Sequence, residues 1–348
     1  MTESYLSSIW ILNYKPVLSN LKIEKSLHSK ITNYIGDNQL PFNLLLNGVQ
    51  GVGKFTIIKT ILNQLYSPNL EERDILSYLK EYYDVPFLFY YQNIYFIDAQ
   101  LSTNNNELNN ILSKLNRISN FKSIDNDYKI FIILHLDKLD IKHQLRLSTI
   151  LEKNINNIRF LGTSSSLIKI IPKLKGLISC LRIPPLSDKF FLSLVKKIFK
   201  NNNINTDFLK EKQVKSSLLK IYINNGKSIK QSLLMIQKIY TEKGTITYES
   251  SFTSKKILKL FDYLGQINFS NLTSIKNYMF HLLGIGLEPH QILHKLLDFI
   301  GNNKSISESK KLEIVHLFAS NEMKLSKCDR DFYVMENILF NLLIILNK

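Results

Sequence analysis

Cysteine is scarce in this chain, which has only two, Cys180 and Cys328. They stand too far apart for the ligand spacing of a metal site and are too few for a disulfide framework. This scarcity excludes a small disulfide-stapled fold and is typical of a reducing compartment. We therefore expect an intracellular protein.

Long apolar runs are missing as well. The longest, at 131–134 and 339–346, are too short to cross a bilayer, and the second is more typical of the end of a buried helix. Residues 1–5 show no basic stretch leading into an apolar run, so we expect no signal peptide. These absences argue against a membrane partner.

Acidic residues are few relative to basic ones, 29 against 45, which leaves a net charge of +16. A surplus of this size favours polyanionic partners, nucleic acid first. The chain is also crowded with Lys, Asn and Ile, which an AT-rich genome would supply without selection for binding. Charge alone therefore indicates a nucleic-acid partner without establishing one.

The 348 residues, 45% of them hydrophobic, are enough for two or three domains. The first half alternates between strand-like and helix-like segments, which predicts an α/β fold with right-handed crossovers. The apolar run 129–136 is rich in β-branched residues, as expected of a central parallel strand buried on both faces. The other predicted strands are 42–47, one or two within 83–97, and 159–163, and the predicted helices are 54–66, 106–119 and 144–155.

From residue 187 onwards the pattern is almost entirely helical. The predicted helices of a small domain are 187–201, 206–224 and 228–241. A linker-like stretch at 242–254 leads into a second helical block at 254–348. The sequence thus predicts an α/β domain followed by two helical regions.

A glycine-rich turn joins the predicted strand 42–47 to the predicted helix 54–66. It fits the pattern G-x-x-x-x-G-K, and its residues are Gly48, Val49, Gln50, Gly51, Val52, Gly53 and Lys54. The glycines let backbone N–H groups turn inward, the helix N-terminus adds a positive dipole, and Lys54 reaches the β and γ phosphates of a nucleotide. We expect this loop to bind ATP or ADP, and the alternative is a relic loop that binds nothing.

The hydroxyl that should hold Mg²⁺ after this lysine is replaced. The position carries Phe55, and Thr56, one residue along the helix, is rotated roughly 100° away. At the end of the central strand, the positions of a metal-binding Asp and a water-activating Glu carry Leu134 and His135, with Asp137 two residues later. We therefore expect Mg²⁺ binding to be weak or absent, no catalytic residue, and no hydrolysis by this chain itself.

Side chains able to ligate a metal do recur near that strand end. His135, Asp137 and His143 make an alternative metal site conceivable. Their spacing matches none of the usual ligand patterns, so we expect no metal site there.

These segments resemble the replication factor C small subunits, which are clamp-loader members of the AAA+ ATPases. Residues 9–16, Ile-Trp-Ile-Leu-Asn-Tyr-Lys-Pro, are similar to the family's L-W-V-x-K-Y-R-P, which packs near the adenine. Gly-Lys-Phe-Thr at 53–56 and Leu-Asp-Lys-Leu at 136–139 are similar to G-K-K-T and V-D-K-L of the family's ATPase-defective small subunit. Residues 286–293 resemble a segment of the family's collar, so the resemblance extends along the whole chain.

The resemblance implies an AAA+ P-loop domain with a parallel sheet at 1–185, a three-helix lid at 186–242 and an all-α collar at 254–348. The adenine side of the nucleotide site would be formed by Tyr14, Lys15 and Pro16. The lid's phosphate sensor would be Lys230, where the family has Arg. Lys keeps the charge of Arg but loses its bidentate fork.

Other family positions have lost their usual residues. The sensor Asn falls on Ser165, the arginine finger falls on Leu177, and two paired arginines fall on Ser148 and Thr149. An arginine finger stabilises charge on the nucleotide of the adjacent subunit. Its loss implies a subunit that gives its neighbour little catalytic help.

The resemblance therefore implies a subunit of a hetero-pentameric clamp loader, which helps load a sliding clamp onto primer-template DNA during replication. It would work in the nucleus, or at a cytoplasmic replication site if the protein is viral. Two alternatives stay open: a nucleotide-free scaffold of such a complex, and a stand-alone P-loop ATPase. Apolar residues on more than one face of 292–300 predict that collar helices pack against those of partners.

Overall fold

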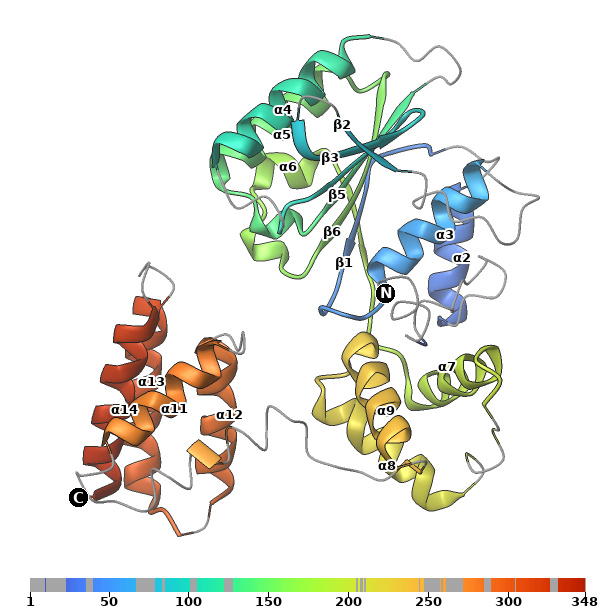
Figure 1. Ribbon diagram of the computed structural model, residues 1–348. Helices are drawn as coiled ribbons and strands as arrows, with labels where there is room; N and C mark the ends of the chain where they lie inside the picture. The colour runs from blue at the N-terminus through green and yellow to red at the C-terminus, as the bar shows by residue number, and fades with distance from the viewer. Residues whose placement is uncertain are drawn as a thin grey trace. The chain divides into compact units, whose positions relative to one another are not determined.

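The computed structural model divides the chain into two compact units, 1–248 and 249–348 (Figure 1). The residues described are 10, 23–35, 40–66, 79–82, 85–100, 105–121, 128–204, 206, 209, 211–243, 245–246, 257, 259–260, 272–284, 289–303, 305–325 and 331–347. Tyr14, Lys15 and Pro16, which we expect on the adenine side, lie outside the described residues.

The first unit contains a seven-stranded sheet with the order β2-β3-β4-β5-β6-β1-β7. The strands are β1 Leu44–Asn47, β2 Lys80–Tyr82, β3 Val85–Tyr91, β4 Ile94–Asp98, β5 Lys129–Leu134, β6 Ile158–Ser164 and β7 Ser179–Arg182. Strands β4, β5, β6, β1 and β7 run parallel to one another, while β2 and β3 add antiparallel pairs at one edge. No strand is predicted from the sequence at β7.

An antiparallel edge is added to the parallel sheet that the sequence predicts. The stretch 83–97 contains both β3 and β4, which are joined by the two-residue turn Gln92-Asn93. Gln92 has a φ of 50°, in the left-handed region that a tight hairpin turn requires. Two residues are too few for a parallel crossover, so β3 runs antiparallel to β4.

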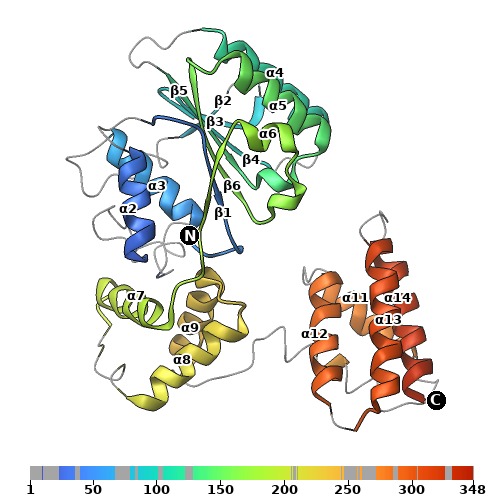
Figure 2. The ribbon, with the colours of Figure 1, turned by 180° about the vertical axis from the view of Figure 1, so that it is seen from behind.

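Helices cover both faces of the sheet. Helices α2 (Lys25–Ile35) and α3 (Lys54–Tyr66) lie on one face, and α4 (Asn105–Ser119), α5 (Ile141–Lys153) and α6 (Pro172–Gly176) lie on the other, as Figure 1 and the reverse view in Figure 2 show. Alternate residues of β5 enter two separate cores. Phe131 and Ile133 pack on the side of α4 and α5, and Ile130 and Ile132 pack on the side of α2 and α3. Strand β5 is therefore buried on both faces, as predicted.

Three further helices belong to the first unit: α7 (Asp188–Asn201), α8 (Lys212–Asn224) and α9 (Ile229–Lys243), termed the lid helices below. They have a core of their own, in which the rings of Phe191 and Tyr222 stack with centroids 4.0 Å apart. The ring of Trp10 adds to this core, 5.0 Å from Phe199 and 5.5 Å from Tyr240. Trp10 is thus anchored to the lid helices.

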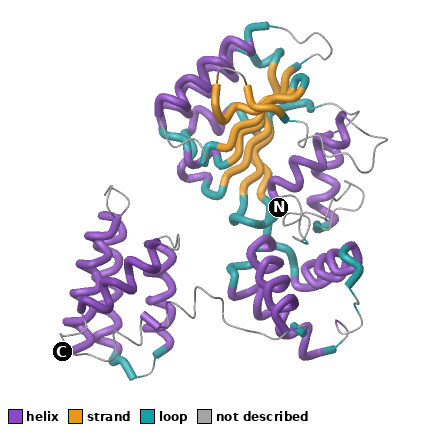
Figure 3. The backbone as a smooth tube through the Cα atoms, viewed as in Figure 1, coloured by secondary structure: helices purple, strands orange, loops and turns teal. Residues whose placement is uncertain are grey.

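The second unit is helical throughout its described part (Figure 3). Its main helices are α11 (Leu272–Gly284), α12 (Pro289–Asn302), α13 (Glu308–Leu325) and α14 (Asp331–Asn347). Ile292, Leu296 and Ile300 of α12 are buried in a core shared with the other three helices. This corrects the expectation that 292–300 needs helices from a partner, because the unit's own helices bury its apolar residues.

The predicted fold class is confirmed: a mostly parallel α/β sheet is followed by helical segments. The finer boundaries, at 1–185, 186–242 and 254–348, stay a prediction. Within the described ranges, no helix is both long and apolar enough to cross a membrane.

Candidate functional site

The glycine-rich loop lies between the end of β1 at Asn47 and the start of α3 at Lys54, at the carboxyl edge of the parallel strands. Its first residue, Gly48, donates its N–H to the carbonyl oxygen of Ser164 at 3.1 Å. A Cβ at Gly48 would lie 2.4 Å from the carbonyl oxygen of Ile183, so no larger residue fits there. Gly51 and Gly53 have φ values of +77° and +98°, which favour glycine. The loop therefore has the backbone turn that its sequence predicts.

Lys54 lies inside this loop. Its side chain is buried, and Nζ donates to the carbonyl oxygens of Gly48 at 2.6 Å and Val49 at 3.0 Å. Burial lowers the pKa of Lys54, and the nearby carboxylate of Asp137 acts in the opposite direction. The ammonium group is thus positioned where the loop would receive phosphates.

The lid helix α9 begins directly against the same loop. The N–H groups of Ile229 and Lys230 both donate to the carbonyl oxygen of Gly51, at 3.0 Å and 3.2 Å. Ser228, just before the helix, is buried, and its carbonyl oxygen accepts from the N–H and the hydroxyl of Ser232. Although Lys230 is 179 positions from Gly51 in the sequence, the structure brings the two together. The side chain of Lys230 is exposed.

Phe55 stands where a hydroxyl would hold Mg²⁺. Its side chain is exposed, and its ring lies 6.0 Å from the ring of Phe96, with Nζ of Lys59 5.7 Å above it. Thr56, the next residue, is half-buried. An aromatic ring offers no oxygen to a hard cation, so the Phe55 side chain contributes no Mg²⁺ ligand.

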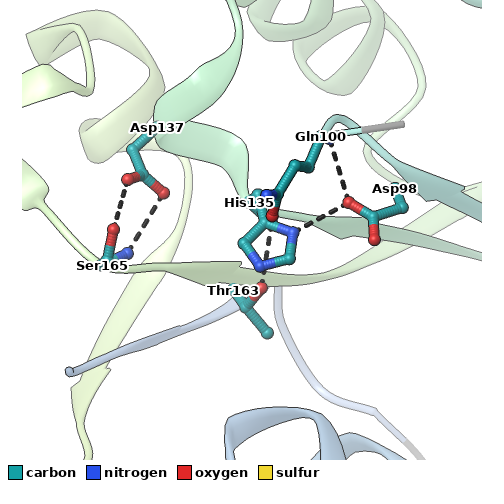
Figure 4. Close-up of polar contacts among 6 residues, drawn as sticks. All are labelled: Asp98, Gln100, His135, Asp137, Thr163 and Ser165. Atoms are coloured by element: carbon teal, nitrogen blue, oxygen red, sulfur yellow. Dashed lines mark hydrogen bonds and ion pairs between the residues drawn. The ribbon is translucent and has the colours of Figure 1, made fainter. Parts of the chain in front are cut away.

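Asp98, His135 and Thr163, at the ends of β4, β5 and β6, form a polar cluster at the carboxyl edge of the sheet (Figure 4). His135 has a left-handed backbone with a φ of 53°, and its N–H donates to Oγ1 of Thr163 at 3.0 Å. Its ring nitrogen Nδ1 lies 2.8 Å from Oδ1 of Asp98, which also accepts the N–H of Gln100 at 3.0 Å. Burial by itself would raise the pKa of Asp98, but the hydrogen bonds from His135 and Gln100 outweigh it and hold that pKa below its usual value.

Asp98 is a residue that the sequence analysis does not single out. It ends the aromatic and β-branched run of β4, and it pairs in register with Leu134. The sequence signal for Asp98 is an acidic residue at the last position of the strand predicted next to the central strand. No feature of the local sequence says that it faces His135.

Asp137 is a second carboxylate at this edge of the sheet. It accepts the N–H of Ser165 at 3.1 Å and the hydroxyl of Ser165 at 2.5 Å (Figure 4). Burial alone would raise the pKa of Asp137, and these hydrogen bonds hold it below its usual value instead. Ser165, which the sequence resemblance aligns with a sensor position, thus contacts Asp137 at the same edge.

His143 and Leu177, which the sequence also singles out, do not contact this polar cluster. His143 is buried on α5, and among the described residues no three His, Cys, Asp or Glu side chains are grouped so that they could hold a metal ion. His135, Asp137 and His143 do not form such a group. Leu177, which the resemblance aligns with the arginine finger, packs against the core around α5 and α6.

Comparisons with known proteins find distant relatives. No protein-family model matches the chain. It is 21% identical over 312 residues to replication factor C subunit 5 of Schizosaccharomyces pombe, covering 84% of each chain. It is 24% identical over 324 residues to replication factor C subunit 5 of Mus musculus, covering 91% of this chain and 86% of that one. It is 20% identical over 342 residues to a replication factor C small subunit of Thermoplasma acidophilum, covering 96% of each.

Solved structures give a weaker likeness. A mutant of the Thermotoga maritima protein RuvB superposes with a TM-score of 0.48 and 12% identity, over 79% of this chain and 87% of that one. A second mutant of the same protein gives a TM-score of 0.46.

Proposed function

We propose that this chain, a distant homologue of the replication factor C small subunits, is a clamp-loader subunit of the AAA+ type that binds nucleotide without hydrolysing it. The proposal rests on a contrast between the residues that would bind phosphate and those that would bind Mg²⁺. The loop keeps its glycines and a buried Lys54, and the backbone N–H of Lys230 donates to Gly51 of the loop. Phe55 and Leu134, by comparison, offer no ligand to Mg²⁺.

ATP or ADP is the ligand that this loop chemistry suits. The loop N–H groups, the start of α3 and Lys54 together provide donors and positive charge for phosphate oxygens. Nζ of Lys54 now contacts two neutral carbonyl oxygens. A phosphate oxygen is a charged acceptor and makes a stronger bond, so the lysine would exchange its partners when nucleotide binds. Tyr14, Lys15 and Pro16 are proposed for the adenine side from the sequence resemblance.

Assembly with other subunits is proposed for the second unit, as the collar of a hetero-pentamer. Several large apolar side chains of this unit are exposed, although its interior is well packed. Leu312 and Val315 on α13 are 69% and 50% exposed, and Phe340 on α14 is 46% exposed. A contiguous exposed apolar patch is typical of a surface that a partner covers, and Leu312 and Val315, three positions apart on α13, lie on one face of that helix.

The partners proposed beyond the loader itself are a sliding clamp and primer-template DNA. The net charge of +16 supports contact with DNA phosphates rather than with base edges. The proposed place of action is the nucleus, or a cytoplasmic replication site if the protein is viral.

The decisive experiment is affinity purification of the full chain from its own cells, with mass spectrometry of the proteins that copurify. Other clamp-loader subunits should be recovered. In parallel, the purified chain should bind a fluorescent ATP analogue, and Lys54→Ala should weaken the binding. Recovery of subunits without nucleotide binding would indicate a scaffold, and steady hydrolysis without subunits would indicate a stand-alone ATPase.

A further inference from the structure

Helix α7, one of the lid helices, carries a row of lysines on its outward side. Lys189, Lys196 and Lys200, termed the α7 lysine row below, are all exposed. At 100° per residue, the three positions fall within about 40° of one another around the helix. The other side of α7 enters the core of the lid helices, through Phe191, Leu194, Val195, Ile198 and Phe199. The core therefore fixes which way the row faces, and it faces away from the lid.

The positive charge of this row is not neutralised by the described residues. No ion pair among them involves Lys189, Lys196 or Lys200. Asp188 is the one acidic residue of α7, and it lies about 100° around the helix from Lys189. Because an α-helix rises 1.5 Å per residue, the row is a strip of positive charge about 16 Å long.

The lysine-rich composition of the whole chain does not explain this row. Helix α13, with 18 residues, carries three lysines and three glutamates, and Lys311 pairs with Glu308 at 3.1 Å. Helix α7, with 14 residues, carries four lysines and a single acidic residue. A general excess of lysine would act on both helices alike. The concentration of unpaired charge on α7 therefore indicates a surface that binds an anionic partner.

The chemistry of the row suits a nucleic acid better than a protein or a membrane. No large apolar side chain of α7 is exposed, and the helix contains no Arg. Protein interfaces rely on aromatic and Arg anchors, and lysine is depleted in them. A helix lying in a membrane surface inserts its apolar face, whereas that of α7 is buried in the lid core. Lysine is a flexible point charge, which suits a chain of phosphates.

We propose that the α7 lysine row binds the phosphate backbone of duplex DNA without reading its sequence. The length of the row matches about five nucleotides of one strand, which rise 3.4 Å each along the duplex axis. The inference rests on the DNA contact of the proposed function and names a surface that makes it. It requires neither bound nucleotide nor another subunit.

The test is fluorescence anisotropy of the full chain with a labelled duplex of about 20 base pairs, at salt concentrations from about 50 to 200 mM. The variant that combines Lys189→Gln, Lys196→Gln and Lys200→Gln should bind at least about tenfold more weakly than the wild type at about 100 mM salt. The slope of log K against log salt should become shallower by about 2 to 3, because each phosphate contact contributes about 0.9. Two duplexes of unrelated sequence should show the same losses.

A single substitution on each of two helices provides the matched comparison. Lys200→Gln removes an exposed lysine from the last turn of α7, and Lys324→Gln does the same on α13. Lys200→Gln should reduce the salt slope by about 0.9, and Lys324→Gln should leave both slope and affinity unchanged. Glutamine keeps a high helix propensity, so all variants should unfold at the temperature of the wild type.

Three outcomes would overturn the inference, and they differ in what else they affect. DNA binding with an unchanged salt slope in the triple variant would place the contact elsewhere. If the wild type binds no duplex even at low salt, the inference fails together with the proposed DNA contact, while nucleotide binding and copurification of loader subunits are judged by their own measurements. Cosedimentation with phosphatidylserine vesicles that is lost in the triple variant, with duplex binding unaffected, would assign the row to a membrane surface.

Discussion

Gly51 of the phosphate loop has no room for a side chain, because a Cβ there would lie 2.1 Å from the hydroxyl oxygen of Ser228. Ser228 directly precedes lid helix α9, whose first N–H groups donate to the Gly51 carbonyl oxygen. The phosphate loop and the lid helix are therefore in contact through backbone atoms. A nucleotide that changed the conformation of the loop would therefore change the contact of the loop with helix α9.

Gly51→Ala should disrupt both sides of this contact. The φ of +77° disfavours any side chain, and the new Cβ would push Ser228 away. We expect the free energy of unfolding to fall by about 2 kcal/mol and nucleotide binding to weaken. Gly176→Ala is the matched control, because a Cβ there meets nothing within 4 Å and should change stability by less than about 0.5 kcal/mol. Urea unfolding of both variants measures the difference, and equal stabilities would contradict the prediction.

The isolated chain should show no measurable ATPase activity. No carboxylate stands at Leu134 or His135 to hold Mg²⁺ or to activate water in the manner of the active family members. A steady-state assay at high protein concentration measures this. Hydrolysis that disappears in Lys54→Ala would show that the site is catalytic after all.

Nucleotide affinity should depend little on Mg²⁺. Exchanging EDTA for millimolar Mg²⁺ should change the dissociation constant of ATP by less than about threefold, because Phe55 provides no hydroxyl ligand. Phe55→Thr restores that hydroxyl and should increase the Mg²⁺ dependence. Titration of both proteins with and without the metal makes the comparison, and a strong Mg²⁺ effect in the wild type would indicate other metal ligands.

Exposed apolar residues of α13 should mediate assembly. Leu312→Asp should reduce copurification of partner subunits severalfold, with little change in thermal stability, because Leu312 is 69% exposed. Ile155→Asp introduces the same charge at a 57% exposed position of the first unit and serves as the control. Quantitative mass spectrometry of tagged variants gives the readout. Equal recovery from both variants would place the assembly surface elsewhere.

Asp137 should stabilise the fold at neutral pH but not in acid. Its hydrogen bonds with Ser165 depress its pKa in the folded state. A depressed folded pKa adds stability above the unfolded value, which is near 3.9, and this stability is lost as the pH falls through the folded pKa. Asp137→Asn should therefore lower the urea midpoint at pH 7, and the difference should shrink below about pH 4. A difference that stays constant between pH 7 and pH 3 would assign the effect to packing instead of charge.

The amino-acid sequence by itself determined the local features of this protein. A continuous apolar run marks β5 as buried on both faces, and helical spacing places α3 at Lys54–Tyr66. The glycine pattern from Gly48 to Gly53 predicts the loop, because the positive φ values at Gly51 and Gly53 favour glycine. Each of these features depends on residues within a few positions along the chain, so a local sequence pattern can predict it.

Only the tertiary structure decided which distant residues meet. His135 and Asp98 are 37 positions apart, and Gly51 accepts hydrogen bonds from residues far along the chain at the start of α9. The apolar faces of α12 looked available for a partner, yet helices of the same unit cover them. Periodicity shows that a face is apolar or that a strand ends in a charge, but it does not show what lies opposite. That is set by the order of the strands and by the packing of the helices, because these contacts are non-local.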